Sequence, residues 1–385
     1  MSSTPHPKTP RRPGLRVRSR HFWQRVSEGR QVDDLWAQFA ADARASYGFY
    51  SREVDWDEFK GASRWRRPFH VAWALFQAML MKLSAARRVL LLAALVMLAL
   101  SGIDFRAGSN GFSLDFKFLA AAMLFVLLAL ELTDKITMKR DLEIAREIQS
   151  WLVPAAPPEV PGAEIAFAAR PQNTVAGDYY DAFYPGADAA AANGPLLVVI
   201  ADVAGKSVPA ALLMATLQAS LHTIASERVP LQALVTRLNR YACVHSLDGR
   251  RFTTAVLAEY DPATGALVYV NAGHNAPVLR RANGSLEFLS QGGLPFGIQP
   301  GAKYETGSLV LEKGDVAVLF TDGVVEAFDA SASEFGNERW LAAIRALPQA
   351  PAAELLQSLM QRVDEFVGTT RQSDDITCLV FRRKP

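Results

Sequence analysis

Near the middle of the chain, residues 196–206 read Leu-Leu-Val-Val-Ile-Ala-Asp-Val-Ala-Gly-Lys. Six apolar residues in succession, bounded by a glycine turn, indicate a buried strand. The strand runs directly into an aspartate, Asp202. Other aspartates lie at the ends of predicted strands in the same way. They are Asp178 in the stretch 177–181 (Gly-Asp-Tyr-Tyr-Asp), Asp322 after the apolar stretch 316–321, and Asp374 with Asp375 ahead of 376–381.

Carboxylates at the end of a buried strand are costly unless they are paired, hydrogen-bonded or bound to a cation. Several of them at one rim would repel each other, and a pair of hard divalent cations would remove that repulsion. An isolated Asp-Gly pair is more often a simple turn. Because the aspartates recur at strand ends, and because His and Cys at zinc spacing are absent, the sequence predicts two divalent cations, Mn²⁺ or Mg²⁺.

Such a cation pair can activate a water for attack on a phosphorus centre. This chemistry needs no protein nucleophile, and the sequence contains neither a Gly-x-Ser-x-Gly elbow nor a Cys-based phosphatase loop. Gly205-Lys206-Ser207 resembles the end of a nucleotide-binding phosphate loop, but Ile200 stands where the first glycine belongs. The residues therefore favour metal-assisted phosphoryl chemistry.

Beyond Pro161 the pattern changes to short strands with helices inserted between them. The predicted strands cover residues 164–169, 196–202, 252–260, 266–271, 277–281, 315–320 and 376–381, and the predicted helices cover 209–226, 231–244 and 352–367. Strands and helices do not alternate strictly. We therefore expect an α+β fold with antiparallel layering.

The N-terminal region, residues 1–86, has a different composition. Residues 1–27 are rich in Lys, Arg and Pro and contain no acidic residue, which predicts a disordered basic arm. The net charge of the chain is only +2 and no nucleic-acid-binding fold follows the arm, so we expect no nucleic-acid partner. Residues 28–70 predict helix of unknown role. The apolar stretch 69–81 fits a helix on a membrane surface or a packed core helix.

Two apolar runs, 89–103 and 118–130, come next. Each is shorter than the roughly 20 residues that cross a bilayer, which favours core helices. However, a short polar loop, 104–117, joins the runs, and Arg and Lys gather on their outer flanks. The positive-inside rule then predicts a two-helix transmembrane hairpin over residues 87–133, with both termini in the cytoplasm. The chain would be a multi-pass protein of the cytoplasmic (inner) membrane. A soluble helical hairpin is the alternative.

Residues 134–153 predict a connecting amphipathic helix. Its apolar stripe follows a heptad spacing through Met138, Leu142, Ala145, Gln149 and Leu152. Two copies could pair through this stripe into a homodimer, and packing on the chain's own domain explains the pattern equally well. Prolines from Pro154 onward stop the helix, so we expect the catalytic domain to cover residues 154–385.

Cysteine usage agrees with a cytoplasmic catalytic domain. The chain has two cysteines, Cys243 and Cys378, which lie far apart in apolar surroundings. They build neither a disulfide framework nor a Cys-based metal site.

Six segments of the chain occur in the order seen in PPM-type phosphatases, the relatives of protein phosphatase 2C, and resemble the SpoIIE/RsbU branch. They are Gly177-Asp178-Tyr179-Tyr180-Asp181, Asp202-Val203-Ala204-Gly205-Lys206, Phe252-Thr253-Thr254, Asn271-Ala272-Gly273-His274, Phe320-Thr321-Asp322-Gly323-Val324 and Asp374-Asp375-Ile376-Thr377. The resemblance implies a central antiparallel β-sandwich flanked by helices, with Mn²⁺ or Mg²⁺ at one end. It also implies hydrolysis of phosphoserine or phosphothreonine on an anti-sigma-antagonist (STAS) protein in a signalling pathway.

The resemblance also implies roles by position. Asp202 would bridge both cations and activate the water, and the backbone carbonyl of Val203 would be a further ligand. The remaining ligands would be Asp178, Asp322 and Asp374. The neighbours of the metal site would be Asp181, Asp375 and Gly205.

Two departures from the family pattern matter. Eukaryotic relatives place a His two residues after the bridging aspartate as a general acid, and Ala204 stands there in this chain. His274 is a candidate proton donor, with a structural hydrogen bond at a turn as the alternative role. Ser207 replaces a common glycine, which predicts modest strain if the position needs a positive φ. Neither departure removes a ligand, so an enzyme is favoured over a catalytically silent module that signals by binding a partner protein.

Overall fold

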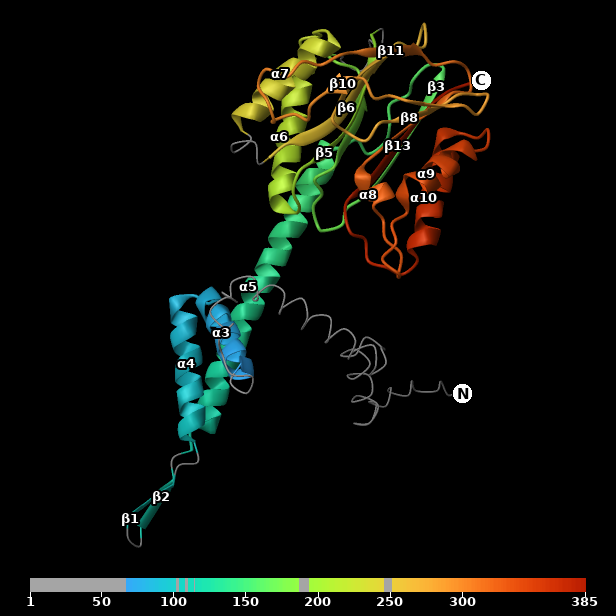
Figure 1. The fold of residues 1–385 in the computed structure, drawn as a ribbon. Helices are drawn as coiled ribbons and strands as arrows, with labels where there is room; N and C mark the ends of the chain where they lie inside the picture. Colours follow the sequence, from blue (N-terminus) through green and yellow to red (C-terminus); the bar gives the residue numbers. More distant parts are fainter. Residues whose placement is uncertain (1–66, 102–103, 108–109, 114, 187–193, 246–250) are drawn as a thin grey trace, which may run out of the picture. The chain divides into compact units, whose positions relative to one another are not determined.

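The computed structural model of the chain describes residues 67–101, 104–107, 110–113, 115–186, 194–245 and 251–385 (Figure 1). The predicted basic arm and nearly all of the predicted helical segment 28–70 lie outside the described residues. The chain divides into two compact units, Met1–Lys135 and Ile136–Pro385. The second unit carries every candidate aspartate.

The first unit contains two helices, a small β-hairpin and the beginning of a third helix among its described residues. They are α3 (Arg67–Lys82), α4 (Ala85–Leu100), β1 (Asp104–Ala107), β2 (Asn110–Ser113) and α5 (Lys117–Leu152). Residues 89–100 of the first predicted apolar run and all of the second run are therefore helical. The segment predicted as a polar loop differs, because β1 pairs with β2 in antiparallel register.

An ion-pair cluster ties α4 to α5 within the first unit. Arg87 lies 2.9 Å from Glu131 and 2.6 Å from Asp134. Among the described helices, α6 (Val208–Ala225) alone is long and apolar enough to cross a membrane, and it packs on a β-sheet of the second unit. The predicted hairpin helices do not reach that length, since α4 has 16 residues and charged residues, Lys117 and Glu131, bound the apolar part of α5.

Helix α5 is a single helix of 36 residues. The connecting helix predicted over 134–153 is therefore continuous with the second apolar run, and no Gly or Pro interrupts the sequence between them. At the far end, the Gln149 side chain accepts a hydrogen bond from the Ala176 N–H at 2.9 Å and donates one to the Ala176 carbonyl at 2.7 Å. This end of α5 thus packs on its own domain.

The second unit is a sandwich of two mainly antiparallel sheets, which confirms the predicted fold class. Its strands are β3 (Ala163–Arg170), β4 (Tyr179–Phe183), β5 (Leu196–Val203), β6 (Thr253–Tyr260), β7 (Ala266–Ala272), β8 (Val278–Arg280), β9 (Leu286–Phe288), β10 (Gly292–Gly293), β11 (Gly307–Val310), β12 (Val316–Phe320) and β13 (Ile376–Arg383). One sheet has the order β10-β7-β6-β5-β4, with β11 also paired to β7. The other has the order β3-β13-β12-β8-β9.

Helices cover the outer faces of both sheets (Figure 1). Helices α6 and α7 (Leu231–Val244) pack on the sheet that contains β5. Helices α8 (Asp322–Val325), α9 (Gly336–Arg345) and α10 (Ala352–Val367) lie on the other side, where α10 packs on β3 and β13. The fold therefore has four layers, with apolar side chains between each pair of layers.

The layers explain the uninterrupted apolar run of β5. Even-numbered residues from Leu196 to Ile200 lie in the cluster between the two sheets. Odd-numbered residues from Leu197 to Ala201 lie in the cluster beneath α6 and α7. Because both faces of β5 are buried, polar residues cannot alternate with apolar ones as they do in a half-exposed strand.

Every strand and helix predicted for this domain is present, with ends within a few residues of those predicted. The sequence pattern missed β4, β9, β10, β11, α8 and α9. Strands of two to five residues show too few alternations to be distinguished from loops.

Candidate active site

The register of the first sheet brings Asp178 and Asp202 to the same end of the sandwich. Asp178 directly precedes β4, and Asp202 is the penultimate residue of β5. The two strands are antiparallel, and Tyr179 pairs with Ala201. The start of β4 therefore lies beside the end of β5.

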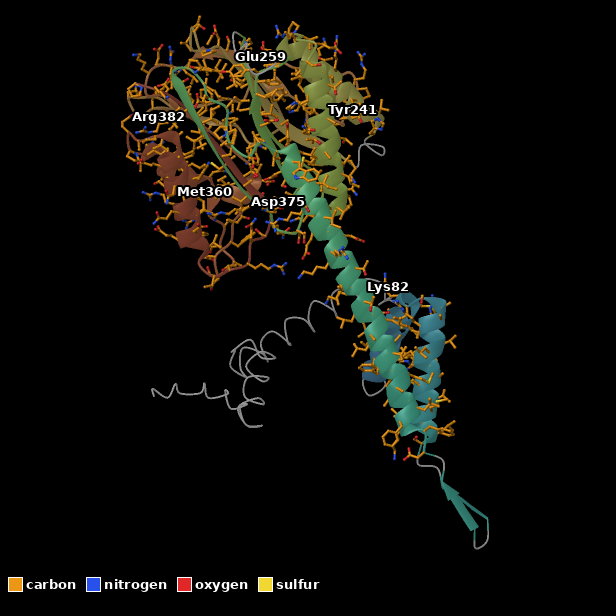
Figure 2. The ribbon with its side chains drawn as sticks, turned by 180° about the vertical axis from the view of Figure 1, so that it is seen from behind. Lys82, Tyr241, Glu259, Met360, Asp375 and Arg382 are labelled. Carbon is orange, nitrogen blue, oxygen red and sulfur yellow. The ribbon has the colours of Figure 1, made fainter. Side chains whose placement is uncertain are left out.

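The second sheet brings the other aspartates to that end by the same geometry. Asp322 follows β12, Asp374 precedes β13, and the antiparallel register pairs Phe320 with Cys378. Figure 2 shows Asp375 at one end of the sandwich, with Arg382 and Glu259 at the opposite end.

A threonine links the two halves of the site. The Thr321 hydroxyl donates a hydrogen bond to Asp178 Oδ2 at 2.9 Å and accepts one from the Thr377 N–H at 3.0 Å. Asp178 belongs to one sheet and Thr321 and Thr377 to the other. The bond therefore fixes a buried carboxylate across the gap between the sheets.

The carboxylates at this end perturb one another. Burial, together with the charges of Asp322 and Asp374, raises the pKa of Asp202 to about 7. Burial raises the pKa of Asp178 well above its usual range, and the charge of Asp202 raises it further. Burial and the charge of Asp374 raise the pKa of Asp322. The four predicted ligands thus form one electrostatically coupled group.

A lysine compensates part of this charge. Lys206 Nζ donates hydrogen bonds to Asp374 Oδ2 at 2.7 Å and to the Ser373 carbonyl at 3.0 Å. The bond to Asp374 raises the pKa of Lys206. The positive charge therefore lies on the rim formed by the loop after β5 and the loop before β13.

Asp375 holds the backbone of the site. Its two carboxylate oxygens accept hydrogen bonds from the Gln172 and Gly177 N–H groups, both at 2.7 Å. A Cβ added at Gly177 would lie 3.2 Å from the Val203 carbonyl oxygen, so the glycine permits close approach of the segments that carry Asp178 and Asp202. Both carboxylate oxygens of Asp375 thus bind backbone N–H groups of the loop that leads to Asp178.

Asp181 lies in a different environment. Its Oδ2 accepts a hydrogen bond from the Tyr179 hydroxyl at 2.7 Å and lies 2.8 Å from His222 Nε2 of α6. Phe183 stacks on the same His222 ring, with 3.9 Å between ring centroids. Asp181 therefore joins β4 to α6, although it follows Asp178 by only three residues in the sequence.

His274 is buried in a turn. Its backbone N–H donates to Asn271 Oδ1 at 2.7 Å, and its Nδ1 hydrogen-bonds with the Thr254 hydroxyl at 2.8 Å. Burial lowers the pKa of His274 to about 4. The imidazole is therefore neutral at pH 7, which favours the structural role over that of a proton donor.

Two residues after β5 have a positive φ. Gly205 has φ 121°, a backbone conformation that favours glycine. Ser207, the residue before α6, has φ 63°. The position thus has the positive φ for which modest backbone strain was predicted.

The donor chemistry of the site fits hard cations. Among the described residues, no three His, Cys, Asp or Glu side chains stand together in an arrangement that holds a metal ion by itself. Mg²⁺ in proteins usually takes one or two carboxylates and keeps several waters. Carboxylate oxygens that repel one another, on four separate segments, suit ions that complete their coordination with water and substrate oxygen.

Sequence reasoning assigned no role to two residues that touch the predicted ligands, Thr321 and Lys206. Both lie inside the quoted family segments, directly before Asp322 and four residues after Asp202. Their contacts to Asp178 and Asp374 span 143 and 168 residues of sequence, so no local pattern could reveal them.

The sequence profile of the family described as Stage II sporulation protein E (SpoIIE) matches residues 192–384, half of the chain. The chain belongs to the SpoIIE family. Its second unit also resembles the solved SiaA-PP2C domain of Pseudomonas aeruginosa, with a TM-score of 0.55 and 23% identity. That match covers 65% of this chain and 98% of the solved domain, and it shows that the SpoIIE-family domain has the PP2C fold.

Curated relatives support a phosphatase domain. The chain is 30% identical over 190 residues to phosphoserine phosphatase RsbU of Bacillus subtilis, which covers 49% of this chain and 54% of RsbU. It is 26% identical over 283 residues to Protein IcfG of Synechocystis sp., which covers 67% of this chain and 43% of IcfG. This chain therefore spans about half the length of these relatives.

The raised pKa of Asp202 predicts a pH-dependent stability. Between the ordinary carboxyl pKa near 4 and about 7, the folded chain holds a proton that the unfolded chain releases. The bound proton stabilises the folded state at low pH, and this stabilisation is lost as pH rises through about 7. In EDTA, we expect a lower unfolding temperature near pH 8 than near pH 6, measured by circular dichroism. Asp202→Asn should reduce this difference in unfolding temperature, and the same difference in both proteins would contradict the raised pKa of Asp202.

Proposed function

We propose that the chain is a metal-dependent protein phosphatase that removes phosphate from serine or threonine of a partner protein. The observation that carries this proposal is the convergence of Asp178, Asp202, Asp322 and Asp374 at one end of a PP2C-type sandwich, where burial and mutual repulsion raise the pKa of three of them. The kinship with a phosphoserine phosphatase, RsbU, supports the reaction.

The chain's own residues would organise the reaction. Asp202 would reach both cations, Asp178, Asp322 and Asp374 would complete the carboxylate ligands, and the Val203 carbonyl would add a backbone oxygen. Two divalent cations, Mn²⁺ or Mg²⁺, supply an activated water and neutralise phosphate oxygens when bound. Thr321 and Asp375 hold the carboxylates and their loops in place. Since Ala204 and the neutral His274 offer no proton, solvent would protonate the leaving serine oxygen.

A STAS-type phosphoprotein in a signalling pathway is the proposed substrate. This follows from the SpoIIE/RsbU-like segments, all of which are complete in this chain. A catalytically silent module that only binds its partner is the competing function. It would form a complex with the phosphoprotein without releasing phosphate.

The phosphatase proposal is tested with the purified full chain and a phosphoserine protein. We expect phosphate release with Mn²⁺, its loss in EDTA, and a fall of at least about a hundredfold in kcat for Asp202→Asn, since even residues that only support a ligand contribute up to that much. Asp364→Asn is the matched control, because Asp364 is half-exposed on α10 and pairs with Arg170. Unchanged turnover in Asp202→Asn would contradict the proposed role.

We further propose that α4 and the first part of α5 form the membrane hairpin. Large apolar side chains are exposed along both helices, including Val89 and Val96 on α4 and Phe118, Phe125 and Leu128 on α5. Contiguous apolar surface of this kind marks a membrane or protein contact. A 16-residue helix measures roughly 24 Å, and local thinning of the bilayer accommodates the mismatch with a core of roughly 30 Å.

Membrane insertion is tested by alkaline carbonate extraction of membranes from cells that express the chain. We expect the chain to stay in the membrane pellet, because exposed apolar helices resist a wash that removes peripheral proteins. Recovery of the chain in the supernatant would contradict the transmembrane hairpin and favour the soluble helical hairpin.

The proposed homodimer would use the part of α5 beyond the hairpin. Of the predicted heptad stripe, Met138 is exposed, whereas Leu142, Ala145, Gln149 and Leu152 are partly buried and Gln149 packs on its own domain. Ile144 and Ile148 are also exposed on α5, so apolar side chains remain open to a second copy. A monomeric mass of the purified chain at high concentration would exclude this pairing.

A further inference from the structure

A polar hollow of about 460 Å³ lies beside the acidic centre in the second unit. The end of α5 contributes Arg146, the loop before β13 contributes Arg371, and the loop before β4 contributes Gln172 and Asn173. Ser207, at the start of α6, also lines it. The hollow is therefore built from four segments that are far apart in the sequence.

The two arginines of the hollow have no acidic partner among the described residues, and both are exposed. Two other basic residues near the site are paired, since Lys206 binds Asp374 and Arg170 binds Asp364. A guanidinium carries five N–H donors in a planar fork that matches a carboxylate. Arg146 and Arg371 thus present unused donors to one space.

The walls of this hollow touch the proposed metal site. The Gln172 N–H binds Asp375, the neighbour of Asp374, and Ser207 follows Lys206, which binds Asp374 itself. Consecutive Cα atoms in a peptide are about 3.8 Å apart. Residues that neighbour a phosphorylated residue at the acidic centre can therefore reach the hollow.

We propose that Arg146 and Arg371 bind a carboxylate of the substrate protein that lies within a few residues of the phosphorylated serine or threonine. The site would then recognise two charges, the phosphate at the acidic centre and an acidic side chain in the hollow. Charge-assisted bonds from a guanidinium fork to a carboxylate supply both energy and orientation. This inference rests on the proposed phosphatase function and adds a preference in substrate sequence.

The test compares two short phosphoserine peptides that differ only in Asp or Asn residues beside the phosphoserine. With the full chain and Mn²⁺, we expect kcat/KM to be about two- to thirtyfold higher for the Asp peptide, since this is the range that two exposed ion pairs contribute. Added salt should reduce the preference, because salt screens exposed charges.

Charge reversal at both positions, Arg146→Glu with Arg371→Glu, should abolish or invert the ratio of the two kcat/KM values. Arg362→Glu, at an exposed arginine on α10, is the matched control and should keep the wild-type ratio. If circular dichroism shows that the charge-reversed chain misfolds, the neutral pair Arg146→Gln with Arg371→Gln takes its place. This pair should abolish the preference for the Asp peptide without inverting it.

The outcomes separate the two proposals. Equal rates for both peptides with the unaltered chain, or an unchanged preference after charge reversal, would overturn the role of the two arginines while leaving the phosphatase function intact. Release of phosphate from neither peptide, nor from a phosphoserine protein, would overturn the phosphatase function itself.

Discussion

The repulsion between carboxylates gathered at one end of the sandwich is the constraint on which the rest of the structure depends. Asp178 is only 5% exposed, and the pKa of Asp202 is raised to about 7. A buried carboxylate of this kind destabilises the folded state when it is charged, so the surrounding fold must hold it in place. Antiparallel register in both sheets does so, because each aspartate lies where a strand starts or ends beside its neighbour.

Hydrogen bonds around the carboxylates serve the same purpose. Thr321 joins the two sheets through its hydrogen bond to Asp178. Asp375 accepts hydrogen bonds from two backbone N–H groups in the loop that leads to Asp178. The covering helices contribute from outside, since Gln149 of α5 holds Ala176 and His222 of α6 holds Asp181. The acidic centre is thus supported by residues that need not touch a cation themselves.

Much of the fold could be predicted because apolar runs and strand ends are local features. The run from Leu196 to Ala201 predicts β5, and burial of both its faces explains why the run has no polar residue. Asp181 shows the limit of such reasoning. The family resemblance implied a place beside the metal site for Asp181, and its side chain contacts His222 and Tyr179 in the structure. Lys206 and Thr321 could not be assigned because their partners lie more than a hundred residues away.

Calorimetric titration of the metal-depleted chain with Mn²⁺ tests the central claim most directly, because it reports cation binding without any substrate. We expect two bound ions per chain, affinity that rises with pH as the carboxylates lose protons, and loss of most binding in Asp202→Asn. Absence of heat at saturating Mn²⁺ in a folded chain, or identical binding by Asp202→Asn, would contradict a cation site built on these aspartates.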